Sequence, residues 1–60
     1  MTKCEAIDLW QHVFNNELKD IDPGNYYCWE SIITGFFLAL GFFIDETYEM
    51  YQECIKRNCF

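Results

Sequence analysis

The sequence predicts an all-α protein: one three-helix domain over residues 1–60, made of a helical hairpin followed by a third helix. Three observations predict it. Apolar residues recur at helical spacing near the N-terminus, a turn signature follows at residues 22–25, and a glycine near a capping residue divides the apolar second half. Sixty residues are too few for a second domain. An apolar content of 52% favours folding over disorder.

The first helix is expected to begin at about Lys3, because Thr2 and Glu5 have the spacing of a capping box. A helical projection gathers its apolar residues on one half, which therefore predicts a buried face. These residues are Ala6, Ile7, Leu9, Trp10, Val13, Phe14 and Leu18. Glu17 alone points into that half, so it either reaches water from a frayed last turn or meets a cation on a partner.

A turn at Asp22-Pro23-Gly24-Asn25 is expected to separate the first helix from the second. We expect the second helix to start near Asn25 or Tyr26 and to run through Leu40. It is apolar almost all round, which predicts burial on most of its sides.

Small residues form a stripe along the second helix, because Ser31, Gly35 and Ala39 repeat at four-residue spacing after Cys28. Such a stripe lets another backbone or large side chains approach closely. We expect Trp10 and Phe14 of the first helix to fill this groove. The alternative is self-association, in which the stripes of two copies form the seam of a homodimer.

The third helix is expected over residues 46–57, with Gly41 ending the second helix and Asp45 as the N-cap residue. Its predicted apolar face comprises Thr47, Met50, Tyr51, Cys54 and Ile55. Glu53 and Arg57 have the spacing of a favourable ion pair along a helix.

Residues 38–51, with the sequence LALGFFIDETYEMY, resemble the closing helices of repressor-type helix-turn-helix domains. The resemblance covers 14 of the 60 residues and implies the geometry of the turn. The recognition helix of that family has no counterpart in residues 30–37. No DNA-binding residue is therefore transferred to this chain.

Acidic residues outnumber basic ones by ten to four, which gives a net charge of −6. This charge opposes direct binding to nucleic acid or to anionic lipid surfaces. The N-terminus has no secretory signal pattern, so we expect a cytoplasmic protein, in the host cytoplasm if the protein is viral. The four cysteines Cys4, Cys28, Cys54 and Cys59 are then expected as thiols, with a disulfide framework as the alternative.

A membrane-associated protein with an apolar helix at residues 26–44 is a competing hypothesis. Residues 31–44 carry no charge, and the stretch reaches spanning length if Glu30 is tolerated. Polar residues at positions 25–27 and acidic flanks on both sides disfavour a span.

No catalytic residue, metal site or cofactor is predicted. Cys54 and Cys59 form one marginal ligand pair that Cys28 could join, but a zinc site would lack its fourth ligand. His12 is the only candidate base for a cysteine nucleophile, and no cysteine falls at a neighbouring helical position. We therefore expect a protein that is not an enzyme.

Two surface features remain. An acidic ridge of Asp45, Glu46, Glu49 and Glu53 places carboxylates roughly 5–6 Å apart, close to the separation of successive phosphates. The ridge either mimics nucleic acid towards a protein site or only solubilises the chain. The second feature is an excess of aromatic residues over what one small core can enclose, and Trp29, Tyr48 and Tyr51 are the candidate partner-binding residues.

These features predict a small acidic protein that binds and inhibits or modulates a larger protein or nucleoprotein complex. In size and charge it resembles the accessory proteins by which bacteriophages block host enzymes or defence complexes, including anti-CRISPR and anti-restriction proteins. Besides the membrane-associated protein, a structural homo-oligomer is the alternative.

Overall fold

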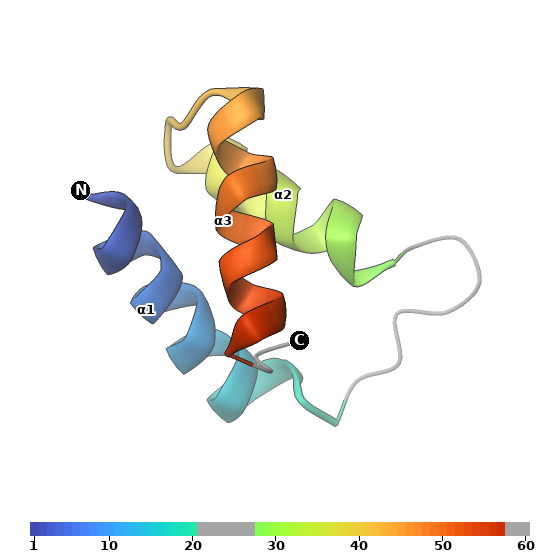
Figure 1. Ribbon diagram of the computed structural model, residues 1–60. Coiled ribbons are helices and arrows are strands. Elements are labelled where there is room, and N and C mark those ends of the chain that lie inside the picture. Colours follow the sequence, from blue (N-terminus) through green and yellow to red (C-terminus); the bar gives the residue numbers. More distant parts are fainter. Residues whose placement is uncertain (21–27, 58–60) are drawn as a thin grey trace.

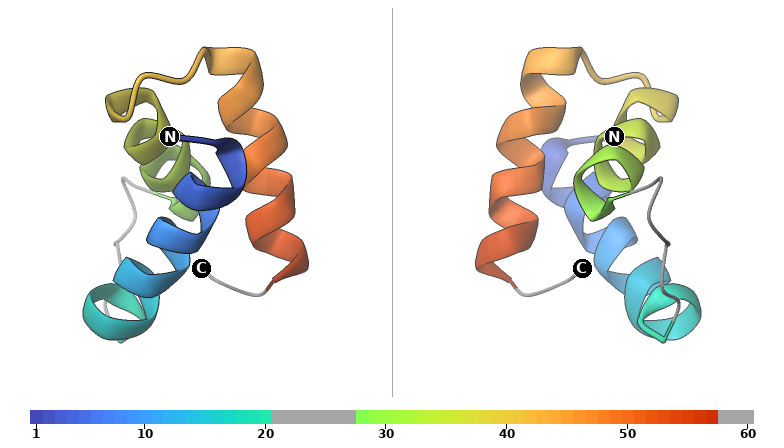
Figure 2. Two further views of the ribbon diagram at one scale, coloured as in Figure 1. Left: turned by 90° about the vertical axis from the view of Figure 1, so that its left-hand side faces the viewer. Right: turned by 90° about the vertical axis from the view of Figure 1, so that its right-hand side faces the viewer.

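The computed structural model describes residues 1–20 and 28–57 and contains α1 (Lys3–Val13), α2 (Trp29–Ala39) and α3 (Ile44–Lys56). Helix α1 continues without a break into a π-helical segment, η1 (Phe14–Leu18). Helices α1 and α3 lie side by side and run in the same direction, while α2 runs back and packs against both (Figure 1). Two further views show the same arrangement (Figure 2). The prediction of a small all-α three-helix domain is confirmed.

The start of α1 is as predicted. The Glu5 N–H donates to Thr2 Oγ1 over 3.1 Å, and the Thr2 N–H donates to Glu5 Oε1 over 2.9 Å. Two backbone donors at the helix start, which have no partner within the helix, are thereby satisfied.

The π-helical segment η1 was not predicted. Asn16 Nδ2 donates to the His12 carbonyl oxygen over 2.8 Å, so the side chain occupies an acceptor that the backbone of a regular helix would use. The Lys19 N–H then donates to the Phe14 carbonyl five residues back, over 2.8 Å. Glu17 is exposed in this segment.

The second helix is shorter than predicted. Cys28 has an extended backbone, with φ −121° and ψ 159°, and is the N-cap residue, so α2 begins at Trp29 rather than at residue 25 or 26. The predicted turn at residues 22–25 and the predicted helix start at residue 25 or 26 lie within residues 21–27, which are outside the described residues.

Gly41 ends α2 as predicted, in a Schellman motif. The Gly41 N–H donates to the Leu38 carbonyl over 3.0 Å, and the Phe42 N–H donates to the Phe37 carbonyl over 3.3 Å. Gly41 has φ +100°, a conformation that glycine adopts most easily. The half-buried Phe42 then packs against the core, which fixes the direction in which the chain leaves α2.

The N-cap of α3 was predicted wrongly. The helix begins at Ile44 with Phe43 as its N-cap residue, and Asp45 lies inside the first turn. Glu46 Oε1 accepts from the Phe43 N–H over 3.3 Å. This is one of the two hydrogen bonds of a capping box, the one from the N-cap backbone to the side chain at the third helical position. The phenyl ring of Phe43 has no acceptor for the other half.

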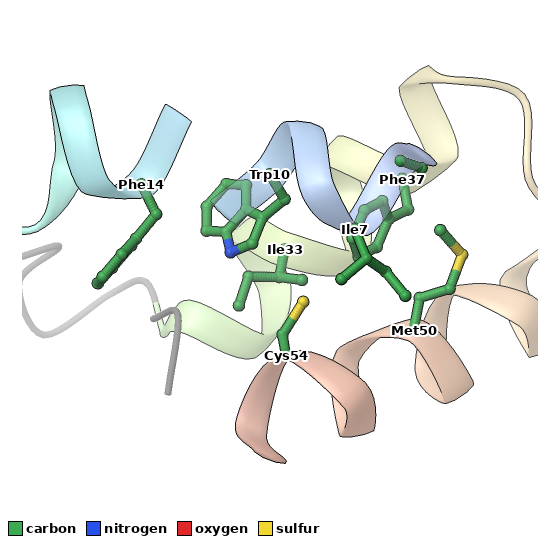
Figure 3. Close-up of a cluster of buried hydrophobic side chains, with 8 residues drawn as sticks. Ile7, Trp10, Phe14, Ile33, Phe37, Met50 and Cys54 are labelled. Carbon is green, nitrogen blue, oxygen red and sulfur yellow. The ribbon is translucent and has the colours of Figure 1, made fainter. Parts of the chain in front are cut away.

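The core lies where the three helices meet (Figure 3). Its buried hydrophobic residues are Ala6, Ile7, Trp10, Phe14, Ile33, Phe37, Met50 and Cys54. Thr34 and Thr47 are also buried, and each hydroxyl donates to a carbonyl of its own helix. The predicted apolar face of the first helix is buried apart from Leu9, which is exposed, and Val13 and Leu18, which are half-buried.

The prediction that α2 is buried on most sides was wrong. Only Ile33, Thr34 and Phe37 of α2 are buried. The ring of Trp10 packs against Phe36, with ring centroids 5.2 Å apart, and against Trp29 at 6.3 Å. Trp10 thus contacts large side chains of α2, whereas Ser31, Gly35 and Ala39 of the small-residue stripe are exposed.

Candidate interaction surface

The acidic ridge lies along α3, where it binds two cations: Lys3 at the start of α1 and Arg57 at the C-cap of α3. Lys3 Nζ is 2.9 Å from Glu49 Oε2 and 3.6 Å from Glu46 Oε2. At the other end, Arg57 Nε is 3.4 Å from Glu53 Oε1, which is the predicted pair within one helix. Three of the four ridge carboxylates are therefore paired with a cation of the same molecule.

Arg57 also binds a residue of α1: its Nη1 donates to Asp8 Oδ1 over 2.7 Å. This hydrogen bond raises the pKa of Arg57, and the hydrogen bond to Glu49 raises the pKa of Lys3. The two cations tie the start and the middle of α1 to α3.

Two carboxylates of the ridge remain available to a partner. Asp45 forms no ion pair with any described residue, and it is exposed in the first turn of α3. Glu49 pairs with Lys3, yet its side chain is 72% exposed. Both lie in the first two turns of α3.

The three predicted partner-binding aromatic residues occupy different environments. Trp29 is half-buried, with its ring 5.4 Å from that of Phe14. Tyr51 is also half-buried, and burial together with the nearby Glu30 raises its pKa. Tyr48 is 49% exposed. Among these three, Tyr48 presents the most surface to a partner.

Exposed large apolar side chains gather around the turn between α2 and α3. We call four of them the turn patch: Leu40, Phe43, Ile44 and Tyr48, which are 36%, 78%, 52% and 49% exposed. The patch combines the C-cap of α2, the N-cap of α3 and the first two turns of α3. Apolar side chains grouped in this way mark an interaction site more often than scattered ones do.

Phe43 is one of the chain's many aromatic residues, but it is not among the predicted site residues. A usable signal was present, because the run Phe42-Phe43-Ile44 follows a helix-ending glycine. Consecutive residues at a helix start point in different directions, so they cannot all face one core.

The predicted self-association residues Ser31, Gly35 and Ala39 are all exposed on α2. A methyl group added at Gly35 would meet no atom within 4 Å apart from its chain neighbours and the backbone of its own helix. The prediction that Trp10 and Phe14 cover this stripe within one chain was therefore wrong.

No group of three or more metal-ligating side chains occurs in residues 1–20 and 28–57. Cys4 and Cys28 are exposed thiols and Cys54 is a buried one, whereas Cys59 lies outside the described residues. Cys28 Sγ lies 3.4 Å from Ser31 Oγ, and this hydrogen bond lowers the pKa of Cys28. His12 Nδ1 lies 3.2 Å from Asn16 Nδ2, and no described hydrogen bond joins it to a thiol.

An open groove runs between α1 and α3, with Ile7 and Met50 at its base and charged residues along its walls. Lys3, Glu49, Glu53 and Arg57 of the two ion-pair clusters line it, together with Cys4, Gln52 and Lys56. The lining offers no nucleophile paired with a base among the described residues.

None of the described helices is both long enough and apolar enough to cross a membrane. No family model, curated protein or solved structure matches this chain.

Proposed function

We propose that this chain is a non-enzymatic protein that binds and inhibits or modulates a larger protein, and that the turn patch is its main anchor. The observation that carries the proposal is Phe43. Its side chain is 78% exposed at the N-cap of α3, where a small polar residue would serve the helix better.

Phe43 is unfavourable for the stability of the fold in two separate ways. An exposed phenyl ring gains no stability from burial, and it cannot accept a hydrogen bond from the first turn of α3. Replacing a good N-cap residue with an apolar one typically costs about 1 kcal/mol of stability. A residue that is unfavourable for the isolated fold in both ways is well explained by a role in binding.

The chemistry of the patch fits that role. Aromatic side chains bury a large area with few rotatable bonds, and Tyr48 adds a hydroxyl that can bond to a partner. Such anchors, grouped at the centre of a contact, account for most of the binding energy of typical interfaces. Ile44 and Tyr48 stand one helical turn apart and so present one continuous surface.

The structure favours anchoring over nucleic-acid mimicry. A mimic needs a row of free negative charges, whereas three of the four ridge carboxylates lie within 4 Å of Lys3 or Arg57. We therefore assign Asp45 and the paired but exposed Glu49 a supporting role at the edge of the patch.

A photo-crosslinking amino acid placed at Tyr48 tests the proposal in cells of the native host. Gln52, exposed on α3 one turn beyond Tyr48, carries the same cross-linker as the matched control. We expect a discrete adduct from position 48 that is lost when Phe43 is changed to Ser in the same chain. Mass spectrometry then identifies the partner.

Adducts that form equally at positions 48 and 52, or that persist in the Phe43→Ser background, would reject the turn patch as the anchor. A partner whose activity is unchanged by saturating amounts of this chain would reject inhibition and modulation, although binding would stand.

A further inference from the structure

We propose that the turn patch binds a protein surface that is apolar at its centre and carries lysine or arginine at its edge. The inference rests on the proposed function and adds the chemistry of the partner. It is carried by the distribution of charge around the patch.

The apolar and acidic residues of α3 form two adjacent columns. Ile44 and Tyr48 lie one turn apart on the helix, as do Asp45 and Glu49. Because consecutive residues are rotated by about a quarter of a turn, the acidic column flanks the apolar one along its length. A partner that covers Ile44 and Tyr48 therefore meets two exposed carboxylates on one side.

Positive charge is scarce at this end of the molecule. Lys3 is the one described cation in contact with the acidic column, and both Glu46 and Glu49 already bind it. Lys56 and Arg57 lie roughly 17–18 Å from Asp45 along the axis of α3. The segment η1, which Lys19 follows in the sequence, lies at the opposite end of the molecule from the α2–α3 turn (Figure 1).

A second copy of this chain is a poorer occupant than a basic partner. In a two-fold contact that pairs the α3 helices antiparallel across the patch, the acidic columns of both copies lie on the same side and approach each other. Each copy also carries a net charge of −6, so like charges would oppose the contact. Complementary charge on a different protein removes this penalty and speeds the encounter.

A pair of model peptides tests the inference. The first is a short amphipathic helix of leucine and lysine, and the second is the same helix with every lysine replaced by glutamate. Titration into the ¹⁵N-labelled full chain, followed by NMR, reports both the affinity and the residues contacted. We expect only the leucine–lysine peptide to bind, with chemical-shift changes centred on residues 40–49 and an affinity that falls as salt is added.

Asp45→Lys and Asp20→Lys form a matched pair of variants. Each changes the net charge from −6 to −4, but Asp20 follows η1 and lies away from the patch. We expect Asp45→Lys to weaken binding of the leucine–lysine peptide about tenfold and Asp20→Lys to change it less than twofold. Circular dichroism shows whether each variant keeps its helices.

Equal weakening by the two variants, equal binding of the two peptides, binding of neither peptide, or shifts confined to the α1–α3 groove would each overturn the inference. A dimer of the chain that Phe43→Ser dissociates in sedimentation experiments would also overturn it, in favour of a second copy. The cross-linking experiment at position 48 tests the proposed function independently of all these results.

Discussion

Trp10 is the residue at which the helices converge. Its side chain is 1% exposed, and its ring contacts Phe14, Trp29 and Phe36 with centroid separations of 5.2–6.3 Å. The sequence indicated that Trp10 is buried, because the helical period is a property of the chain alone. Its contacts could not be predicted, because they depend on which face of α2 turns inward.

We expect Trp10→Ala to unfold the domain. Truncating a buried tryptophan costs about 3–5 kcal/mol, and a core of this size rarely supplies more than about 3–5 kcal/mol in total. The control is Leu9→Ala, one residue earlier, where the side chain is 37% exposed. Circular dichroism should show lost helicity for Trp10→Ala only. A cooperative thermal transition in Trp10→Ala would contradict the assigned core.

The capping box gives Glu5 a pH-dependent role. Hydrogen bonds from the backbone and side chain of Thr2 lower the pKa of Glu5 from its ordinary value of 4.5. A carboxyl whose pKa is lower in the folded state stabilises the fold above its unfolded pKa, and this contribution is lost as the pH falls through the folded pKa.

We therefore expect wild type to be more stable than Glu5→Gln at neutral pH, with the difference shrinking as the pH falls below 4.5. Urea unfolding at a series of pH values measures it. A difference that stays constant over the whole range would show that the charge of Glu5 has no part in the cap.

At the scale of elements, the helix ends that depend on local chemistry were predicted well and the others were not. The start of α1 and the end of α2 follow from short motifs, the capping box and the Schellman glycine. The start of α3 does not, because Asp45 is a good capping residue by type, yet the path set by Phe42 makes Phe43 the N-cap. Tertiary packing outweighed residue preference there.

Two glycines should respond in opposite ways to the same substitution. Gly35 lies mid-helix with open space beside it, so Gly35→Ala should raise the free energy of unfolding by about 0.5–1 kcal/mol. Gly41 has φ +100°, so Gly41→Ala should lower the free energy of unfolding by about 1–2 kcal/mol. Thermal unfolding of both variants measures the contrast. Equal shifts would contradict the turn geometry.

For the whole molecule, the sequence correctly predicted that the core cannot enclose every aromatic ring. Two of the described rings, Phe43 and Tyr48, are exposed, whereas Trp29 and Tyr51 are half-buried. Composition reveals such an excess but does not assign it to residues, since that depends on how three helices pack. The ion pairs between α1 and α3 were missed for the same reason, because Lys3 and Asp8 are distant from α3 in the sequence.

The central claim is that Phe43 serves binding at the expense of the fold. Phe43→Ser tests it most directly, in one protein and with two readouts. Serine supplies the missing capping acceptor, so the free energy of unfolding should rise by about 1 kcal/mol and the melting temperature by about 4–8 °C. Affinity for the partner cross-linked at position 48 should fall about 30-fold or more, as expected for a central anchor. A variant that is destabilised, or that binds this partner as tightly as wild type, would contradict the claim.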